Sequence, residues 1–339
     1  MSTPGLNRRG WLTLAFALSA SLHGCAHREQ LSLHAPGTPL TIRKPALYPE
    51  TILWDPNRDA FLVSSIRHGA VYAVDRTGAV TQLVDDPRLC SVLGIAVDAT
   101  RDRLWVTNAD LGVSLKPSEA GPKRLAGIGL YSLQTGEALR YIDLASLSEG
   151  EHLLNGLALD AAGNAYATDS FSPEIYRVDA QGEAKVFARD ERFRGDGINL
   201  NGLVVHPDGY LLVIKKSDGQ LFKVLLDEPT RVSPVALDQP LVGGDGLSLW
   251  AGEQLLVVAN QVPGTASNAV FALRSTNSWA SASVIDQQDV GSVYPTTGVL
   301  RDDKYYVVHS RLNELIQASP EQQAALQVQA SIRQVGALR

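Results

Sequence analysis

N-G-L-A-L-D at residues 155–160 and N-G-L-V-V-H at residues 201–206 are the stretches that decide the fold. In both, an Asn-Gly pair precedes a short apolar run that is typical of a β-strand. Asn-Gly is also a strong signal for a tight hairpin turn. The hairpin turns of these segments are, however, predicted further along, at residues 160–164 and 207–209. The two pairs are therefore predicted to stand where a strand begins.

The same pattern recurs along the chain at intervals of roughly 40 to 60 residues, which is typical of a repeat architecture. Each copy holds two or three short runs rich in Val, Leu, Ile and Tyr, separated by Asp, Gly, Asn and Pro, as in meandering antiparallel strands. No long amphipathic helix period follows residue 30. The six copies begin at Glu50, Leu93, Asn155, Asn201, Asp245 and Thr297.

These repeats predict an all-β fold, a six-bladed β-propeller with four-stranded antiparallel blades. A single sheet of this kind has two apolar faces and an unpaired edge, and radial stacking of neighbouring sheets covers the faces and protects the edges. A pair of separate β-sandwiches is the alternative. It is disfavoured because the repeats run without a break in composition.

Composition restricts the class of protein. The chain has 339 residues, of which 45% are hydrophobic and 19% charged, as in an ordinary folded protein. Its formal net charge of −6 and the lack of a basic run after the N-terminus disfavour a nucleic-acid partner. A small-molecule substrate is expected instead, and nothing in the sequence predicts the oligomeric state.

The N-terminus carries an export signal. Arg8 and Arg9 precede an apolar run at residues 11–22, which is too short to span a bilayer of roughly 30 Å. Gly24-Cys25 follows and resembles a lipoprotein box, although His23 departs from the small residue usual there, so simple signal cleavage nearby is the alternative. The chain is expected to be a periplasmic or outer-membrane lipoprotein that touches the membrane only through a lipid on Cys25.

The sequence therefore predicts three consecutive segments, namely an export signal (1–25), an N-terminal linker (26–47) and the propeller (48–339). Only Cys90 then remains in the mature chain, so an intramolecular disulfide is excluded. Packing must therefore stabilise the fold.

The first residues of the six copies are predicted to lie on one ring around the channel. Four of them carry carboxylate or amide oxygens, which are ligands that Ca²⁺ prefers, whereas Cys and His, which zinc prefers, are absent. The sequence thus predicts a divalent-cation site. A wet channel lined by polar residues is the alternative. The predicted ligands are Glu50, Asn155, Asn201 and Asp245.

Four motifs carry a resemblance to a known family: P-E-T-I-L-W-D (49–55), L-L-N-G-L-A-L-D (153–160), L-N-G-L-V-V (200–205) and G-G-D-G-L (243–247). Over residues 48–308 the chain resembles the SMP-30/gluconolactonase-like propellers and their relatives, the calcium-dependent phosphotriesterases and paraoxonase-type lactonases. The resemblance implies that the same four residues bind a catalytic cation, Ca²⁺ or another divalent ion such as Mg²⁺, Mn²⁺ or Zn²⁺. It also implies that Asp245 acts as a base. Leu93 departs from the polar substrate contact that many members have, which argues against a sugar lactone.

Polar residues also end the second strand of each copy. His309 is predicted to be either a proton shuttle in the pocket or a hydrogen-bonded histidine at a strand end. Lys215 and Lys216 are predicted to be solvated. The secondary candidates are Asn108, Asp169, Lys215, Asn260 and His309.

Taken together, these residues predict a metal-dependent hydrolase of a lactone, ester or phosphoester, with Asp245 and His309 as the catalytic residues. The alternative is a non-catalytic propeller that uses the same cation to bind a ligand or partner in the cell envelope. A synthase of the strictosidine-synthase-like branch is disfavoured because such proteins usually lack the full ligand ring.

Overall fold

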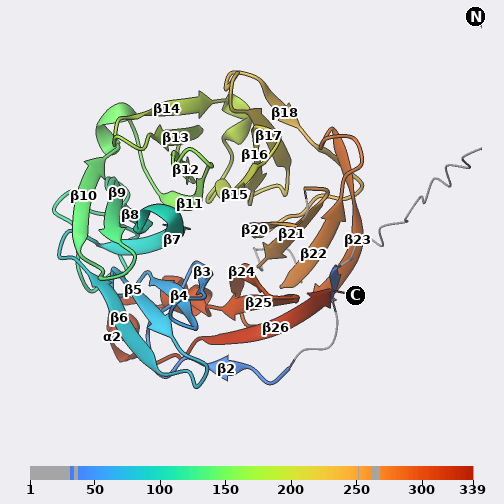
Figure 1. Cartoon of the computed structure of the whole chain (residues 1–339). Helices are drawn as coiled ribbons and strands as arrows, with labels where there is room; N and C mark the ends of the chain where they lie inside the picture. The colour runs from blue at the N-terminus through green and yellow to red at the C-terminus, as the bar shows by residue number, and fades with distance from the viewer. Residues whose placement is uncertain (1–30, 34–36, 251, 261–267, 339) are drawn as a thin grey trace, which may run out of the picture.

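The computed structural model describes residues 31–33, 37–250, 252–260 and 268–338. These residues form six sheets arranged around a central axis, so the predicted six-bladed β-propeller is confirmed (Figure 1). Four sheets have four strands each, and two have a short fifth strand. The predicted export signal and lipoprotein box lie outside the described residues.

The first three blades are regular four-stranded antiparallel meanders. Blade 1 contains β3 (Ile52–Asp55), β4 (Ala60–Ser65), β5 (Ala70–Val74) and β6 (Val80–Asp85). Blade 2 contains β7 (Ser91–Asp98), β8 (Arg103–Ala109), β9 (Ala126–Ser132) and β10 (Ala138–Asp143). Blade 3 contains β11 (Leu154–Leu159), β12 (Ala165–Asp169), β13 (Glu174–Val178) and β14 (Ala184–Arg189).

Blade 4 contains β15 (Leu200–His206), β16 (Tyr210–Lys215), β17 (Leu221–Leu225) and β18 (Val232–Pro234). Blade 5 contains β20 (Gly244–Trp250), β21 (Gln254–Ala259), β22 (Ala269–Arg274) and β23 (Ser281–Asp289), and β19 (Ala236–Leu237) pairs with β23 in parallel. Blade 6 contains β24 (Pro295–Arg301), β25 (Lys304–His309) and β26 (Ser331–Leu338), with β1 (Leu31–Leu33) and β2 (Leu40–Thr41) on its outer edge. Two short helices, α1 (Leu312–Gln317) and α2 (Pro320–Ala325), separate β25 from β26.

Both predicted hairpin turns are present. The Gly163 amide donates to the Asp160 carbonyl at 3.0 Å, and the Gly209 amide donates to the His206 carbonyl at 3.0 Å. Both glycines have positive φ, which these turns require and which glycine adopts without steric cost. Asn155 and Asn201 are therefore outside the turns, as second residues of the strands β11 and β15.

Blade 6 differs from the sequence-based expectation. The segment 26–47, predicted to be a linker, contributes β1 and β2, which pair with β26. The segment from Asn313, read as strand material, is α1 instead. The first and last described strands thus meet in one blade, and this closure cannot be seen in a local pattern because it joins residues about 300 positions apart.

The core is divided among the six interfaces between neighbouring blades, with one apolar cluster at each. Between blades 3 and 4, for example, Ile175 and Phe187 pack against Leu211 and Phe222. Burial of these side chains on radially stacked sheets stabilises the ring of blades by roughly 25 cal/mol per Å² of apolar surface.

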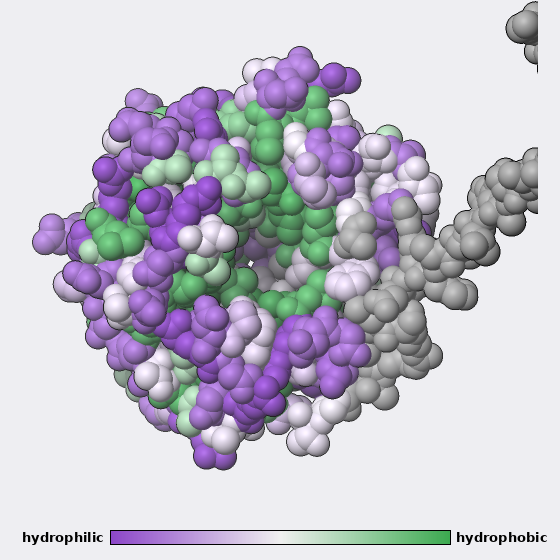
Figure 2. Space-filling view, in the orientation of Figure 1, coloured by the Kyte–Doolittle hydropathy of each residue, from purple (hydrophilic) through white to green (hydrophobic). Residues whose placement is uncertain are grey.

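The first strand of each blade lies nearest the axis, so β3, β7, β11, β15, β20 and β24 surround the channel (Figure 1). Figure 2 shows the face drawn there as hollowed along this axis, with hydrophobic residues around the hollow. Among the described residues, no helix is long and apolar enough to cross a bilayer.

Candidate active site at the channel axis

The strand pairing defines a ring of six residues at one end of the channel, here called the axial ring. In five blades it is the residue that follows the last paired position before the strand bulges away from its neighbour. In blade 1 the Thr51 amide donates to Ser64 Oγ as the Gly156 amide donates to Thr168 Oγ1, which places Glu50 in register with Asn155. The axial ring consists of Glu50, Leu93, Asn155, Asn201, Asp245 and Thr296.

The ring differs from the predicted register at one position. Pro295 pairs with His309 as Gly244 pairs with Ala259, so Thr296 rather than Thr297 is equivalent to Asp245. Thr297 instead donates from Oγ1 to the Glu50 carbonyl at 2.9 Å and accepts from the Ile52 amide at 3.0 Å. It therefore joins blades 6 and 1 beside the ring.

The glycines after the ring residues allow neighbouring blades to approach closely. A Cβ on Gly156 would lie 2.4 Å from the Asn201 carbonyl oxygen, and one on Gly202 would lie 2.2 Å from the Asp245 carbonyl oxygen. Positive φ is not the reason, because neither glycine adopts it. The glycine of each Asn-Gly pair is thus required by packing at the axis, and the asparagine before it places a polar side chain on the ring.

Glu50 and Asp245 form a buried carboxyl pair in the ring, with 4% and 2% of their surface exposed. The atoms Glu50 Oε2 and Asp245 Oδ1 are buried and have no hydrogen-bond partner among the described residues. Burial raises the pKa of Glu50 well above its usual range, and the charge of Asp245 adds to this, while Lys216 opposes it. The pair therefore attracts positive charge, either a proton or a cation.

Lys216 brings an ammonium group into the same cluster. Its Nζ donates to Asp245 Oδ2 at 2.5 Å and to Asn260 Oδ1, and it lies 5.4 Å from the centroid of the Tyr294 ring. Burial lowers the pKa of Lys216 and is the largest single influence, but the charge and hydrogen bond of Asp245, together with the charges of Tyr294 and Glu50, outweigh it, so that the pKa is raised and the lysine stays charged. Asn260 Nδ2 also donates to Asp245 Oδ2, at 2.6 Å.

Tyr294 borders Lys216 from a strained backbone position, with φ of 48°. Burial raises the pKa of its hydroxyl; the charge of Lys216 acts in the opposite direction, and those of Asp245 and Glu50 raise it. Tyr294 remains a neutral phenol at neutral pH, able to donate a hydrogen bond.

The two asparagines complete the polar part of the ring. Asn155 Nδ2 donates to Ser170 Oγ at 3.1 Å, and Ser170 Oγ donates to the Leu200 carbonyl at 2.6 Å. This chain of hydrogen bonds orients the Asn155 amide and leaves its oxygen free of the Ser170 contact. Asn201 is buried on the adjacent strand β15.

An apolar cluster borders the ring. Leu93, which lies on the ring, packs with Tyr48 and Leu153, and α1 covers them with Leu312 and Leu315. Tyr294 and Phe171 are partly buried against the same cluster. The charged group at the axis therefore lies beside apolar and aromatic side chains.

The oxygen set fits a divalent cation. It offers two carboxylates, each with one oxygen that has no hydrogen-bond partner, and the side-chain amides of Asn155 and Asn201. Carboxylate and amide oxygens are the hard ligands that Ca²⁺ binds. The described part of the chain has no group of three or more His, Cys, Asp and Glu residues that would hold a metal. A site here would therefore rely on amide oxygens and water in addition to the two carboxylates.

The prediction that Lys215 and Lys216 are solvated is wrong, since their exposed fractions are 6% and 4%. Successive residues of a strand point to opposite sides, so the two lysines diverge. Lys215 Nζ contacts Asp218 Oδ2 and the Arg192 carbonyl, whereas Lys216 reaches the ring. Lys216 and Asn260 each follow the last paired residue of a second strand, at the same position in neighbouring blades.

His309 holds a different position. It pairs with Pro295 as Lys215 pairs with Leu200 and Asp169 with Leu154, so Ser310 is the residue equivalent to Lys216. Burial and the charge of Arg333 lower the pKa of His309 to about 4, so the imidazole is neutral at pH 7. Its role as a proton shuttle stays a prediction.

Asn108 and Asp169, two of the other secondary candidates, are structural. Asn108 accepts a hydrogen bond from the Cys90 amide and donates to the Arg88 carbonyl. Asp169 accepts from the Leu153 amide and contacts His152 Nδ1 at 2.8 Å. Both residues stabilise loops instead of serving the ring.

Lys216 and Tyr294 are the site residues that the sequence-based ligand set lacks. For Lys216, the available signal is the alignment of blades 4 and 5. Lys216, one residue beyond Lys215, occupies in blade 4 the position that Asn260 occupies in blade 5. Tyr294, with Thr296 and Thr297, is predicted from the sequence to line the mouth of the channel, but its contact with Lys216 has no sequence signal, because it reaches the cluster from the loop before β24.

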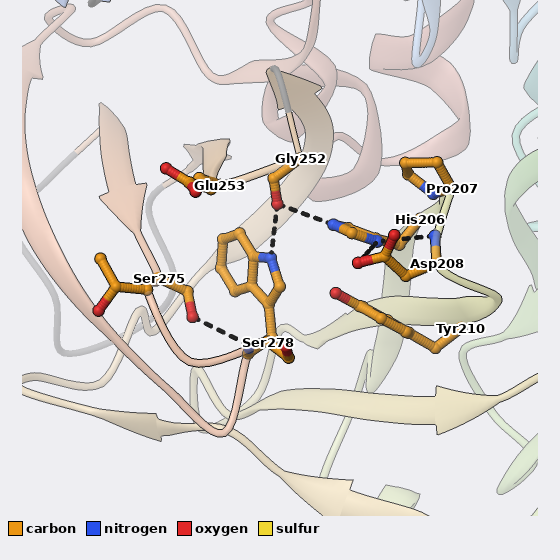
Figure 3. Close-up of a pocket in the computed structure, with 10 residues that line it drawn as sticks. His206, Pro207, Asp208, Tyr210, Gly252, Glu253, Ser275 and Ser278 are labelled. Carbon is orange, nitrogen blue, oxygen red and sulfur yellow. Dashed lines mark hydrogen bonds and ion pairs between the residues drawn. The ribbon is translucent and has the colours of Figure 1, made fainter. Parts of the chain in front are cut away.

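A second hollow, of about 340 Å³, lies at the other end of blades 4 and 5 (Figure 3). His206 stacks on Tyr210 with 4.2 Å between ring centroids, and His206 Nε2 and Trp279 Nε1 both donate to the Gly252 carbonyl. The contact between His206 and Gly252 joins a hairpin of blade 4 to one of blade 5. The aromatic residues of this hollow therefore have a structural role.

Several solved structures resemble this chain in fold. The major allergen Mala s 1 of Malassezia sympodialis superposes with a TM-score of 0.69 at 16% identity, covering 90% of this chain and 97% of the allergen. Luciferin-regenerating enzyme gives 0.60 at 13%, covering 88% and 95%. Virginiamycin B lyase from Staphylococcus aureus gives 0.56 at 10%, covering 90% and 99%.

At such identities the likeness shows the fold alone. No family model and no curated protein matches the chain. The resemblance to the SMP-30/gluconolactonase-like propellers therefore stays a prediction from the sequence motifs, and the neighbours, two of which carry the names of enzymes, share the propeller fold.

Proposed function

We propose that the axial ring is the active site of a divalent-cation-dependent hydrolase that acts on a lactone, an ester or a phosphoester. The observation that carries this proposal is the pair of buried, unpartnered carboxyl oxygens, Glu50 Oε2 and Asp245 Oδ1, on one ring with two amide side chains. Buried acceptors without donors cost free energy, and their retention is typical of functional sites.

Glu50, Asn155, Asn201 and Asp245 would hold the cation, and Ca²⁺ suits their oxygens best. When bound, the ion would supply Lewis-acid polarisation of a carbonyl or phosphoryl group and acidify water. Asp245 accepts hydrogen bonds from Lys216 and Asn260 at Oδ2, which orients its carboxylate and directs Oδ1 to the ring. Tyr294 lies where its phenol can donate to a substrate oxygen.

The apolar cluster around Leu93 narrows the substrate class. A sugar lactone would present several hydroxyl groups to side chains that cannot hydrogen-bond them, at a cost for each unpaired group. A lactone or ester with an alkyl or aryl substituent matches Leu93, Tyr294 and Phe171 better.

A second candidate is favoured by the crowding of Asp245. Oδ2 already accepts from two donors, so only Oδ1 remains to serve as either cation ligand or base. A non-catalytic propeller that binds a ligand through the cation needs only the first of these roles.

The test is a hydrolysis screen of the purified protein on alkyl and aryl lactones, aryl esters and phosphotriesters. Each substrate is assayed with about 1 mM Ca²⁺, in the affinity range of weak extracellular sites, and with a chelator. Hydrolysis that the chelator abolishes and Ca²⁺ restores supports the enzyme. Binding of Ca²⁺ without turnover of any substrate favours the binding propeller, and failure to bind Ca²⁺ contradicts both.

A further inference from the structure

The buried ammonium group of Lys216 gives the axial ring a positive charge of its own. Its Nζ contacts Asp245 Oδ2 and Asn260 Oδ1, two oxygens at the carboxyl pair that also attracts a divalent ion. We propose that Lys216 is a tethered cation that competes with a divalent ion for the carboxyl pair and thereby sets the affinity of the ring. This inference rests on the ring being the cation site proposed above.

The balance of charge in the cluster limits its affinity for a divalent ion. With both carboxyl groups ionised, as cation binding requires, two carboxylates and one ammonium group leave a single net negative charge in a buried cluster. Because like charges repel strongly at low local dielectric, a divalent ion beside Asp245 meets the Lys216 charge at close range. Lys216 therefore reduces the affinity that the four oxygen residues would otherwise give.

Backbone hydrogen bonds hold Lys216 in place. Its amide donates to the Asn199 carbonyl at 2.8 Å, and its carbonyl accepts from the Gly243 amide at 2.9 Å. Gly243 has φ of 86°, and a Cβ on it would lie 2.1 Å from the Asn260 carbonyl oxygen. The backbone that positions Lys216 is therefore packed directly against the segment that carries Asn260.

The unpartnered carboxyl oxygens argue against a purely structural role for Lys216. A lysine kept for fold stability alone would pair with a carboxylate whose oxygens are otherwise satisfied. Here Asp245 Oδ1 and Glu50 Oε2 remain without partners, so Lys216 offsets only part of the negative charge. The cluster thus keeps oxygen acceptors for a further cation, and Lys216 stabilises the cluster while that cation is absent.

The test measures Ca²⁺ binding by calorimetry, and melting temperature with and without Ca²⁺, for the full chain. Lys216→Met removes the charge and keeps the shape of the side chain, so Ca²⁺ should bind more tightly, on the order of 10- to 100-fold. The Ca²⁺-induced rise in melting temperature should grow with it. Lys216→Arg keeps the charge and should not gain affinity.

Lys215→Met is the matched control. It removes a neighbouring buried lysine that pairs with Asp218 outside the ring, so its Ca²⁺ affinity should equal that of the wild type. If Lys216→Met does not fold without Ca²⁺, then Ca²⁺ should restore its folding. The variant Lys216→Met with Asp245→Asn should fold without the ion and lose the gain in affinity.

Equal affinity of Lys216→Met and wild type overturns the proposal, and so does an equal gain in Lys215→Met. A Lys216→Met protein that folds neither with Ca²⁺ nor together with Asp245→Asn also overturns it, because charge balance would then not be its role. Because binding is read without substrate, a gain in affinity supports the inference even if the screen finds no hydrolysis. A Ca²⁺-dependent hydrolase without that gain would keep the proposed function and refute the inference.

Discussion

Gly202 lies against Asp245 of the next blade so closely that a Cβ on Gly202 would lie 2.2 Å from the Asp245 carbonyl oxygen. The same relationship joins Gly94 to Asn155 at 2.3 Å and Gly156 to Asn201 at 2.4 Å. Each of these three ring residues is thus held by the glycine of the preceding blade. The spacing of the polar side chains at the axis depends on these backbone contacts.

Gly202→Ala should destabilise the protein by about 3 kcal/mol or more, because the added methyl group meets backbone that cannot move aside. Urea unfolding measures the change in free energy. Gly37→Ala is the control, since a Cβ there meets nothing within 4 Å and the φ is not positive. Equal stability of the two variants would contradict the packing argument.

Asp245→Asn should lower kcat/KM by about 10²–10⁴-fold if Asp245 is the base. The change keeps the shape of the side chain but removes a negative charge and the capacity to accept a proton. Metal content and melting temperature are measured alongside, because the variant also loses the ion pair with Lys216. Unchanged kcat/KM at full metal occupancy would exclude Asp245 as the base.

Asn155→Asp is the contrasting variant. It retains an oxygen on the ring and adds negative charge, so it should hold the cation at least as well and lose less activity than Asp245→Asn. Ser170 Oγ, which accepts from Asn155 Nδ2 and donates its single proton to the Leu200 carbonyl, would have to give up that donation to bond the new carboxylate. A larger loss in Asn155→Asp than in Asp245→Asn would reverse the assigned roles.

The pH dependence of stability should carry a contribution from His152. The hydrogen bond and charge of Asp169 raise the pKa of His152 despite its burial. A histidine whose pKa is raised in the folded state stabilises it fully below its unfolded pKa of about 6.5, and this contribution is lost as pH rises through the folded pKa. His152→Leu should therefore cost about 1.5–3 kcal/mol at pH 6 and less at pH 9.

Chemical unfolding of wild type and His152→Leu at the two pH values checks this prediction. Asp169 keeps its hydrogen bonds from the Leu153, Phe171 and Ser172 amides in the variant, so the loop should remain formed. A difference in stability between the two proteins that does not change with pH would contradict the assignment.

Membrane attachment is predicted from the N-terminal sequence, with Arg8-Arg9 before the apolar run and Cys25 after it. The wild type should fractionate with membranes, and Cys25→Ser should release it, because acyl chains would be the anchor. Soluble wild-type protein whose N-terminus lies beyond Cys25 would exclude the lipid and leave export intact.

The repeat pattern was sufficient to predict the six blades, because strand alternation and turn residues are local properties that recur in each copy. It was also sufficient to place Glu50, Asn155, Asn201 and Asp245 on one ring, since equivalent positions of inner strands share a level along the axis. In blade 6 it misplaced the ring residue by one position and missed the edge strands. Aligning Thr297 by its glycine missed that the strand bulge begins at Pro295, and the pairing of β1 and β2 with β26 has no local signature.

The sequence by itself thus determined the number of blades, the position of the hairpin turns and the polar set at the axis. Only the tertiary structure decided the electrostatics of that set. Lys216 and Asp245 are 29 residues apart, and their pairing arises because neighbouring blades bring the end of β16 beside the start of β20. Burial then makes the charge of one lysine matter, since a low local dielectric strengthens every interaction that water would otherwise screen.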